Sequence, residues 1–281
     1  MKSIKTLLGV VFMAALSLQV SAQELPKPSP SASFKQTVGV TNISMKYSRP
    51  SVKGRTIWGD LVAYDKVWRA GANSSTKINF STDVIINGKE VPAGKYALFV
   101  IPSANEWTFI ISSHITGNGT SGYTEDSDIV RVTAKPMASN MTESLLYSVD
   151  NLTDNSCTIS LSWEKVTAGF DVKINTKEFA KVVVEKTVAE ADKSFRSYNN
   201  AAKWYLDNGD AAKAVEMGEK SVSQTKKFWN VTVLSEAYFA AGDVKMAIKT
   251  AQEAVELSEK ADYQPYVKKN KANIEAWKAK K

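Results

Sequence analysis

The sequence has a single cysteine, Cys157, and a single histidine, His114. One thiol cannot close an internal disulfide, so the fold must depend on an ordinary apolar core. Zinc sites generally need more than one His or Cys ligand, and a Ser-His-Asp triad would have to use His114. Neither a Gly-x-Ser-x-Gly motif nor a phosphate-binding glycine loop between a strand and a helix is present. The sequence therefore disfavours zinc, hydrolase and nucleotide chemistry, and we expect no catalytic residue, cofactor or metal.

Long apolar runs are also scarce. The main one is Leu7–Leu18, which follows Lys2 and Lys5 and precedes the small residues Val20-Ser21-Ala22, in the order of a secretory signal peptide with its cleavage site. The run has 12 residues, whereas a helix needs about 20 to cross a bilayer. We expect residues 1–22 to be a cleaved signal peptide, the protein to be exported to the periplasm or the medium, and the mature chain to have no transmembrane segment.

Positive charge is in modest excess, with a formal net charge of +7. Residues 23–175 contain 15 Lys and Arg against 14 Asp and Glu, whereas residues 176–281 contain 19 against 15. An exported protein meets little nucleic acid, so we interpret the basic C-terminal part as a solvated helix surface and expect no nucleic-acid partner.

The first half of the mature chain has the pattern of strands and turns. Residues 23–33 are rich in Pro and Ser and predict an extended tether, so we expect the folded part to begin near Phe34. Asn87-Gly88 is the dipeptide that most readily forms a tight hairpin. The predicted strands cover residues 36–47 (interrupted by Gly39), 78–86, 96–101, 107–112, 129–134, 143–149, 157–163 and 170–174. Short strands without intervening helices predict an antiparallel β-sandwich over residues 34–175.

Apolar residues recur at helical spacing from residue 176 to residue 281, with helices expected at about 178–195 and 265–279 among others. Two segments match at an offset of 33 residues, pairing Tyr205 with Tyr238 and Gly209-Asp210 with Gly242-Asp243. This spacing of aromatic, Gly-Asp and Ala resembles the tetratricopeptide repeat. The predicted fold class is therefore α+β in several parts: a β-sandwich, then a tetratricopeptide-like array of helical hairpins, whose concave face would suit a protein partner.

Arginine and tryptophan are concentrated in a segment between two predicted strands. It contains the strings Arg49-Pro50-Ser51-Val52-Lys53-Gly54-Arg55 and Trp68-Arg69-Ala70-Gly71-Ala72-Asn73. Together with Glu106-Trp107-Thr108, these strings resemble the exported bacterial family known as domain of unknown function 2911, over about residues 33–174. The resemblance implies a β-sandwich in the cell envelope or medium of Gram-negative bacteria. It implies no established activity.

The same segment offers candidate ligand-binding residues. A guanidinium group presents a planar set of donors for carboxylate, phosphate or sulfate, and an indole face stacks on sugars or cations. The candidates are Arg49, Arg55, Trp68, Arg69, Asn73 and His114, and the ligand class would be a small anion or a carbohydrate. Alternatively, Trp58 and Trp68 plug the core and the arginines pair with Asp60, Asp65 or backbone carbonyls.

Two functions follow from these patterns. The first is a non-catalytic, exported binding protein that presents the Arg/Trp loop and a helical module for a partner. The second is an enzyme of unknown class that acts on an acidic or carbohydrate substrate, with Arg49, Arg55, Arg69 and His114 near its pocket.

Overall fold

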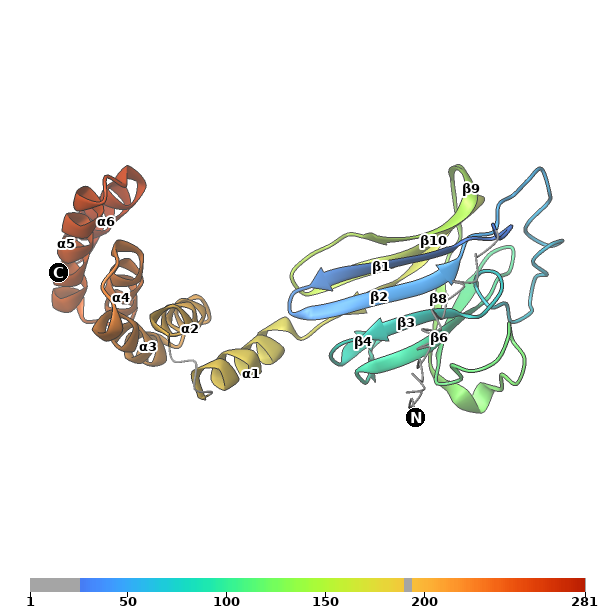
Figure 1. Ribbon diagram of the computed structural model, residues 1–281, viewed down its shortest axis with the longest axis horizontal. Coiled ribbons are helices and arrows are strands. Elements are labelled where there is room, and N and C mark those ends of the chain that lie inside the picture. Colours follow the sequence, from blue (N-terminus) through green and yellow to red (C-terminus); the bar gives the residue numbers. More distant parts are fainter. Residues whose placement is uncertain (1–25, 190–193, 281) are drawn as a thin grey trace, which may run out of the picture.

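The computed structural model describes residues 26–189 and 194–280. The predicted signal peptide and residues 23–25 of the predicted tether lie outside these ranges. Within them, no helix is both long and apolar enough to span a membrane. Antiparallel strands form the first part and helices the second, which confirms the predicted α+β class (Figure 1).

The strands form two sheets that pack face to face. The strands are β1 (Ser31–Val38), β2 (Thr41–Ser48), β3 (Thr76–Phe80), β4 (Val84–Ile86), β5 (Lys89–Val91), β6 (Gly94–Ile101), β7 (Trp107–Ser112), β8 (Asp128–Ala134), β9 (Met137–Asp150) and β10 (Ser156–Lys173). A 3₁₀ turn, η1 (Glu125–Ser127), precedes β8. One sheet has the order β1-β2-β3-β6-β7-β8 and the other β5-β4-β10-β9. Alternate residues of both sheets face inward and form one large apolar core.

Local turn chemistry sets several of these boundaries. Asn87 and Gly88 have φ values of 51° and 74° and close the β4–β5 hairpin, as the type I′ preference predicts. Gly39, with a φ of 56°, also closes a hairpin, because Val38 pairs directly with Thr41. The single predicted strand over residues 36–47 is therefore wrong: it is two strands, and the first of them begins at Ser31, before the predicted start of the fold at Phe34.

The predicted strand over residues 78–86 also divides, because β3 lies in one sheet and β4 in the other. In contrast, β10 folds back on itself at Glu164, which has a φ of 56°. Thr158 Oγ1 donates to Asp171 Oδ1 at 2.7 Å, and the Ser162 and Thr167 hydroxyls lie 2.7 Å apart, so the two arms run side by side. These arms correspond to the predicted strands 157–163 and 170–174. Cys157 is buried in the first arm, and burial raises the pKa of its thiol to about 11.

The second part consists of α1 (Thr176–Ala189), α2 (Phe195–Asp207), α3 (Ala211–Gln224), α4 (Phe228–Ala240), α5 (Val244–Lys260) and α6 (Gln264–Lys278). The predicted helix 178–195 thus corresponds to α1 over most of its described residues, but its last residue, Phe195, is the first residue of α2, with Ser194 as the N-cap. Gly209 and Gly242 have φ values of 83° and 86° in the α2–α3 and α4–α5 turns. Asp210 and Asp243 follow them and cap α3 and α5. Two helical hairpins therefore form where the repeat predicts them, and the kinship to tetratricopeptide repeats stays a prediction.

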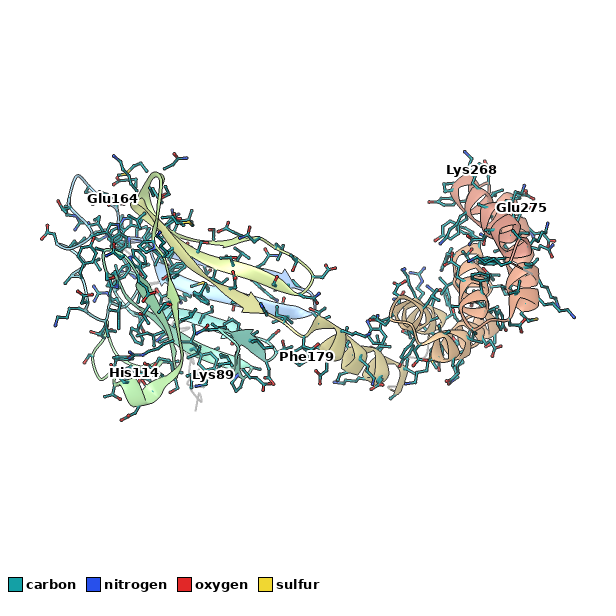
Figure 2. The ribbon with its side chains drawn as sticks, turned by 180° about the vertical axis from the view of Figure 1, so that it is seen from behind. Lys89, His114, Glu164, Phe179, Lys268 and Glu275 are labelled. Atoms are coloured by element: carbon teal, nitrogen blue, oxygen red, sulfur yellow. The ribbon has the colours of Figure 1, made fainter. Side chains whose placement is uncertain are left out.

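Helix α1 connects the two parts. Phe179 packs against the sandwich core, whereas Val184 and Val188 pack against the first helical cluster. Figure 2 shows Phe179 where α1 leaves the sandwich, at the end opposite the loops that carry His114 and Glu164. The Arg/Trp segment belongs to that far end.

Candidate functional site

The segment between β2 and β3 covers one end of the sandwich and is fixed by backbone hydrogen bonds. Val52 N donates to the Glu143 carbonyl at 2.8 Å, and Trp68 exchanges two backbone hydrogen bonds with Val100, at 2.8 and 2.9 Å. These bonds join the segment to β9 and to β6. A long loop without regular structure needs such anchors, and their result is a fixed surface.

Four tryptophans pack together where the segment meets the core: Trp58 and Trp68 belong to the segment, and Trp107 and Trp163 belong to β7 and β10. Trp58 packs 4.5 Å from Trp107 and 5.9 Å from both Trp68 and Trp163, measured between ring centroids. Trp107 and Trp163 are each 1% exposed, whereas Trp58 and Trp68 are half-buried. The indoles of the segment therefore extend the core outward, as the structural interpretation of the sequence proposes for Trp58 and Trp68.

Arg49 joins the segment to β9. Its Nε donates to the Leu145 carbonyl at 2.8 Å, and its Nη2 donates to the Ser144 carbonyl at 3.2 Å. Both bonds connect residues almost a hundred positions apart in the sequence. Arg49 thus has a structural role and does not line the hollow described below.

We expect Arg49→Ala to lower the free energy of unfolding by about 2 kcal/mol, because two carbonyls lose a charged donor. Chemical denaturation of the wild-type and variant proteins measures this loss. A variant as stable as the wild type would contradict the structural role.

Arg55, Trp68 and Arg69 surround a hollow of about 340 Å³, whose lining also includes Ser29, Thr120 and Trp163. We call this cavity the arginine hollow. None of the described residues that line it is Asp, Glu or His. Arg55 donates from Nε and Nη2 to the Val52 and Ser51 carbonyls, at 3.0 and 2.6 Å, and its side chain remains exposed. These bonds leave the charge of Arg55 unbalanced at the rim.

Arg69 is held differently. Its Nε is buried and has no hydrogen-bond partner among the described residues, as is also true of Trp163 Nε1. Its Nη1 lies against Gly119: a Cβ at Gly119 would come within 2.9 Å of that nitrogen. In residues 26–189 and 194–280, neither Arg55 nor Arg69 forms an ion pair with a carboxylate. Unpartnered buried donors are uncommon and costly, so Arg69 and Trp163 each carry an unsatisfied N–H group close to the hollow.

Asn73 and His114 do not line the arginine hollow. Asn73 Nδ2 donates to the Ser29 carbonyl at 3.1 Å and to Ser48 Oγ at 3.2 Å, which fixes the chain that enters β1. His114 Nε2 donates to the Ser121 carbonyl at 3.0 Å. This bond closes the loop that brings Gly119 and Thr120 to the hollow, so His114 supports the site from outside.

The backbone beneath Arg69 has an uncommon conformation. Ala70 has a φ of 53°, which non-glycine residues seldom adopt, and it is fully buried. Its carbonyl accepts hydrogen bonds from Thr76 Oγ1 at 2.8 Å and from Tyr147 Oη at 2.9 Å. Such conformations persist only where the surroundings over-determine them, and they occur frequently at binding sites.

The strand-and-loop part of the chain matches a known protein family. Residues 29–172 match the sequence profile of the family described as "Protein of unknown function (DUF2911)". The chain belongs to this family. No curated protein and no solved structure matches the chain.

The family match covers the whole arginine hollow of this DUF2911 protein, from Ser29 to Trp163. Of the candidates predicted from the sequence, Arg55, Trp68 and Arg69 line the hollow, and Trp163 and Thr120 line it without having been predicted. The sequence predicts Trp163 as a strand residue, and it does lie in β10, but no sequence signal indicates that the glycine-rich loop from Gly117 to Gly122 lies against Arg69. The isolated bridge between Ser74 and Asn118 is what joins the two loops.

Alkaline pH should destabilise this DUF2911 domain. Burial raises the pKa of Tyr147 well above its usual value, and burial raises the pKa of Tyr123 to about 12. An unfolded tyrosine ionises near pH 10. The stability from both residues is therefore fully present below about pH 10 and is lost as the pH rises toward 12.

We expect the free energy of unfolding to fall steeply between about pH 10 and 12, and to fall less steeply in Tyr147→Phe. Urea titrations at several pH values measure both slopes. Equal slopes in the two proteins would contradict the assignment to Tyr147.

Proposed function

We propose that this DUF2911 protein is an exported, non-catalytic binding protein whose arginine hollow takes a small anionic molecule. The proposal rests mainly on one observation: two arginines line a cavity whose described lining contains no acidic residue. A cavity with cationic donors and no anionic acceptor attracts a ligand that supplies the acceptors, such as a carboxylate, phosphate or sulfate.

The size and chemistry of the hollow narrow the ligand class. Its volume of about 340 Å³ is at the lower end of the range for small-molecule sites, which suits a molecule the size of one sugar unit. The half-buried Trp68 provides apolar surface, and the buried Trp163 lies behind it, with the two rings stacked at a centroid distance of 6.0 Å and an interplanar angle of 16°. Apolar ring surface beside arginine donors suits an acidic sugar or a sugar phosphate.

Binding is favoured over catalysis by the kinds of side chain present. General acid–base catalysis uses His, Asp, Glu or similar groups within hydrogen-bond reach of the substrate. The described lining of the hollow has none of the first three, and His114 bonds Ser121 outside it. The enzyme hypothesis therefore lacks a proton-transfer group among the described residues that line the hollow.

Export to the periplasm or the medium of a Gram-negative bacterium is part of the proposal and rests on the signal-peptide pattern of residues 1–22. The helical part, α2 to α6, is the proposed module for a protein partner. Its support is the stacking of successive helical hairpins, since such arrays present an extended surface to partners.

Ligand titration tests the binding function. Sodium glucuronate and inorganic phosphate are the anionic probes, and glucose is the neutral control of similar size. Because Trp68 and Trp163 line the hollow, intrinsic tryptophan fluorescence should change saturably with at least one anion and not with glucose. A response to neither anion, or an equal response to glucose, would overturn the proposed function.

A further inference from the structure

A second surface of the sandwich has a concentrated positive charge. The strands β1, β2, β3 and β6 lie side by side (Figure 1). Four of their lysines alternate with the buried residues and therefore lie on the outward face. Lys46 on β2 pairs directly with Lys77 on β3. In the neighbouring row, Lys35 on β1 and Lys95 on β6 are the two ends, and Ser44 and Asn79 lie between them. We call this surface the lysine face.

No acidic side chain balances this charge within the four strands. Their sequences contain no Asp or Glu, although residues 23–175 as a whole have 15 basic and 14 acidic residues. Lys77 Nζ donates to Ser75 Oγ and to the Ile115 carbonyl, and neither group carries charge. Like charges directly opposite each other on adjacent strands destabilise a sheet, because their Cβ atoms are only about 5 Å apart. The arrangement of Lys46 and Lys77 therefore opposes folding in the absence of an anion.

The lysine face is also hollowed. The four lysines, Ser44 and Asn79 line a shallow depression of about 610 Å³. It shares no lining residue with the arginine hollow. The hydroxyl of Ser44 and the amide of Asn79 lie between the charges, where they can bond to hydroxyl groups of a sugar chain.

We propose that the lysine face binds a linear anionic polysaccharide, with carboxylate or sulfate groups paired to the lysines and sugar hydroxyls bonded to Ser44 and Asn79. Charge complementarity favours an extended polyanion, since the lysines occupy two rows across four strands. A lipid surface is the weaker match, because none of the exposed large apolar side chains among the described residues lies on β1, β2, β3 or β6. This site is separate from the proposed small-molecule site.

The test compares two triple variants of the full-length mature protein. The first, Lys35→Gln with Lys46→Gln and Lys95→Gln, removes the three exposed lysines of the face and keeps the hydrogen-bonded Lys77. The matched control removes three exposed lysines of the helical part, Lys245, Lys249 and Lys268, by the same change to Gln. Both variants therefore lose the same net charge.

The probes are polygalacturonate for carboxylate, heparin for sulfate and dextran as the neutral polymer. We expect the wild type to bind at least one anionic polymer and not dextran. The face variant should bind at least about tenfold more weakly and with a shallower dependence on salt, because fewer counterions are released. The helical control should bind like the wild type. The face variant should keep the wild-type response to glucuronate and phosphate, because its three lysines do not line the arginine hollow, so failure of this proposal and failure of the small-molecule site are distinguishable.

Three results would overturn the proposal. One is an absence of binding to both anionic polymers. Another is an equal loss of binding in the two triple variants, which would indicate non-specific attraction by net charge. The third is a preference for vesicles of phosphatidylglycerol and phosphatidylcholine, or for duplex DNA, over both polysaccharides.

Discussion

Arg69→Ala should weaken the binding of glucuronate or phosphate at least about tenfold and leave thermal stability almost unchanged. A hydrogen bond to a charged group contributes about 1.5–3 kcal/mol, and each 1.4 kcal/mol changes affinity tenfold. Stability should change little because Arg69 Nε has no hydrogen-bond partner to lose among residues 26–189 and 194–280. Calorimetric titration and thermal unfolding of the same samples measure the two effects.

Two further variants serve as controls for Arg69→Ala. Arg69→Lys keeps the charge but loses the planar donor set, so it should recover only part of the affinity. Arg49→Ala should show the opposite pattern, with lower stability and unchanged affinity, because Arg49 bonds the Leu145 and Ser144 carbonyls away from the hollow. A large loss of stability in Arg69→Ala with intact binding would mean that Arg69 is structural too.

Trp107→Ala should have the largest effect on folding. Trp107 is 1% exposed and packs 4.5 Å from Trp58 and 6.3 Å from Phe109, so its removal leaves a large cavity under the Arg/Trp segment. Truncation of a buried Trp to Ala costs about 3–5 kcal/mol. For a domain of this size, that loss corresponds to a fall in Tm of roughly 10 °C.

In calorimetry, Trp107→Ala should lower the unfolding temperature of the sandwich and leave that of the helices unchanged, because the two parts have separate apolar cores. Trp277→Ala is the matched control. Trp277 is 6% exposed and stacks on Phe239 in the helical part, so its removal should lower the unfolding temperature of the helices. A single transition that shifts equally in both variants would contradict separate cores.

The sequence predicted the features that depend on local chemistry. Asn87-Gly88 specifies its hairpin because both residues tolerate a positive φ, and Gly209-Asp210 specifies a helix end and the next helix start. Gly39 is ambiguous in the sequence, because one glycine between two alternating stretches suits an interrupted strand as well as a hairpin. The strand pairing decides between them: Val38 pairs directly with Thr41, and Gly39 has a φ of 56°.

The sequence predicts only some of the residues of the arginine hollow, because the others depend on tertiary contacts. Composition indicated that arginines and indoles gather in one segment, but it could not separate Arg49 from Arg69. Their roles depend on contacts distant in sequence, with Leu145 for Arg49 and with Gly119 for Arg69. The lysine face likewise requires the register that places Lys46 opposite Lys77.

NMR of the indole N–H groups tests the central claim most directly. With the protein labelled with ¹⁵N, glucuronate or phosphate should shift the Trp163 and Trp68 indole signals with one saturable affinity. The signals of Trp107, beneath the hollow, and Trp277, in the helices, should stay in place. The Trp163→Phe and Trp68→Phe variants assign the two responsive signals. Binding that saturates without moving either signal, or that moves the Trp277 signal instead, would contradict a ligand in the arginine hollow.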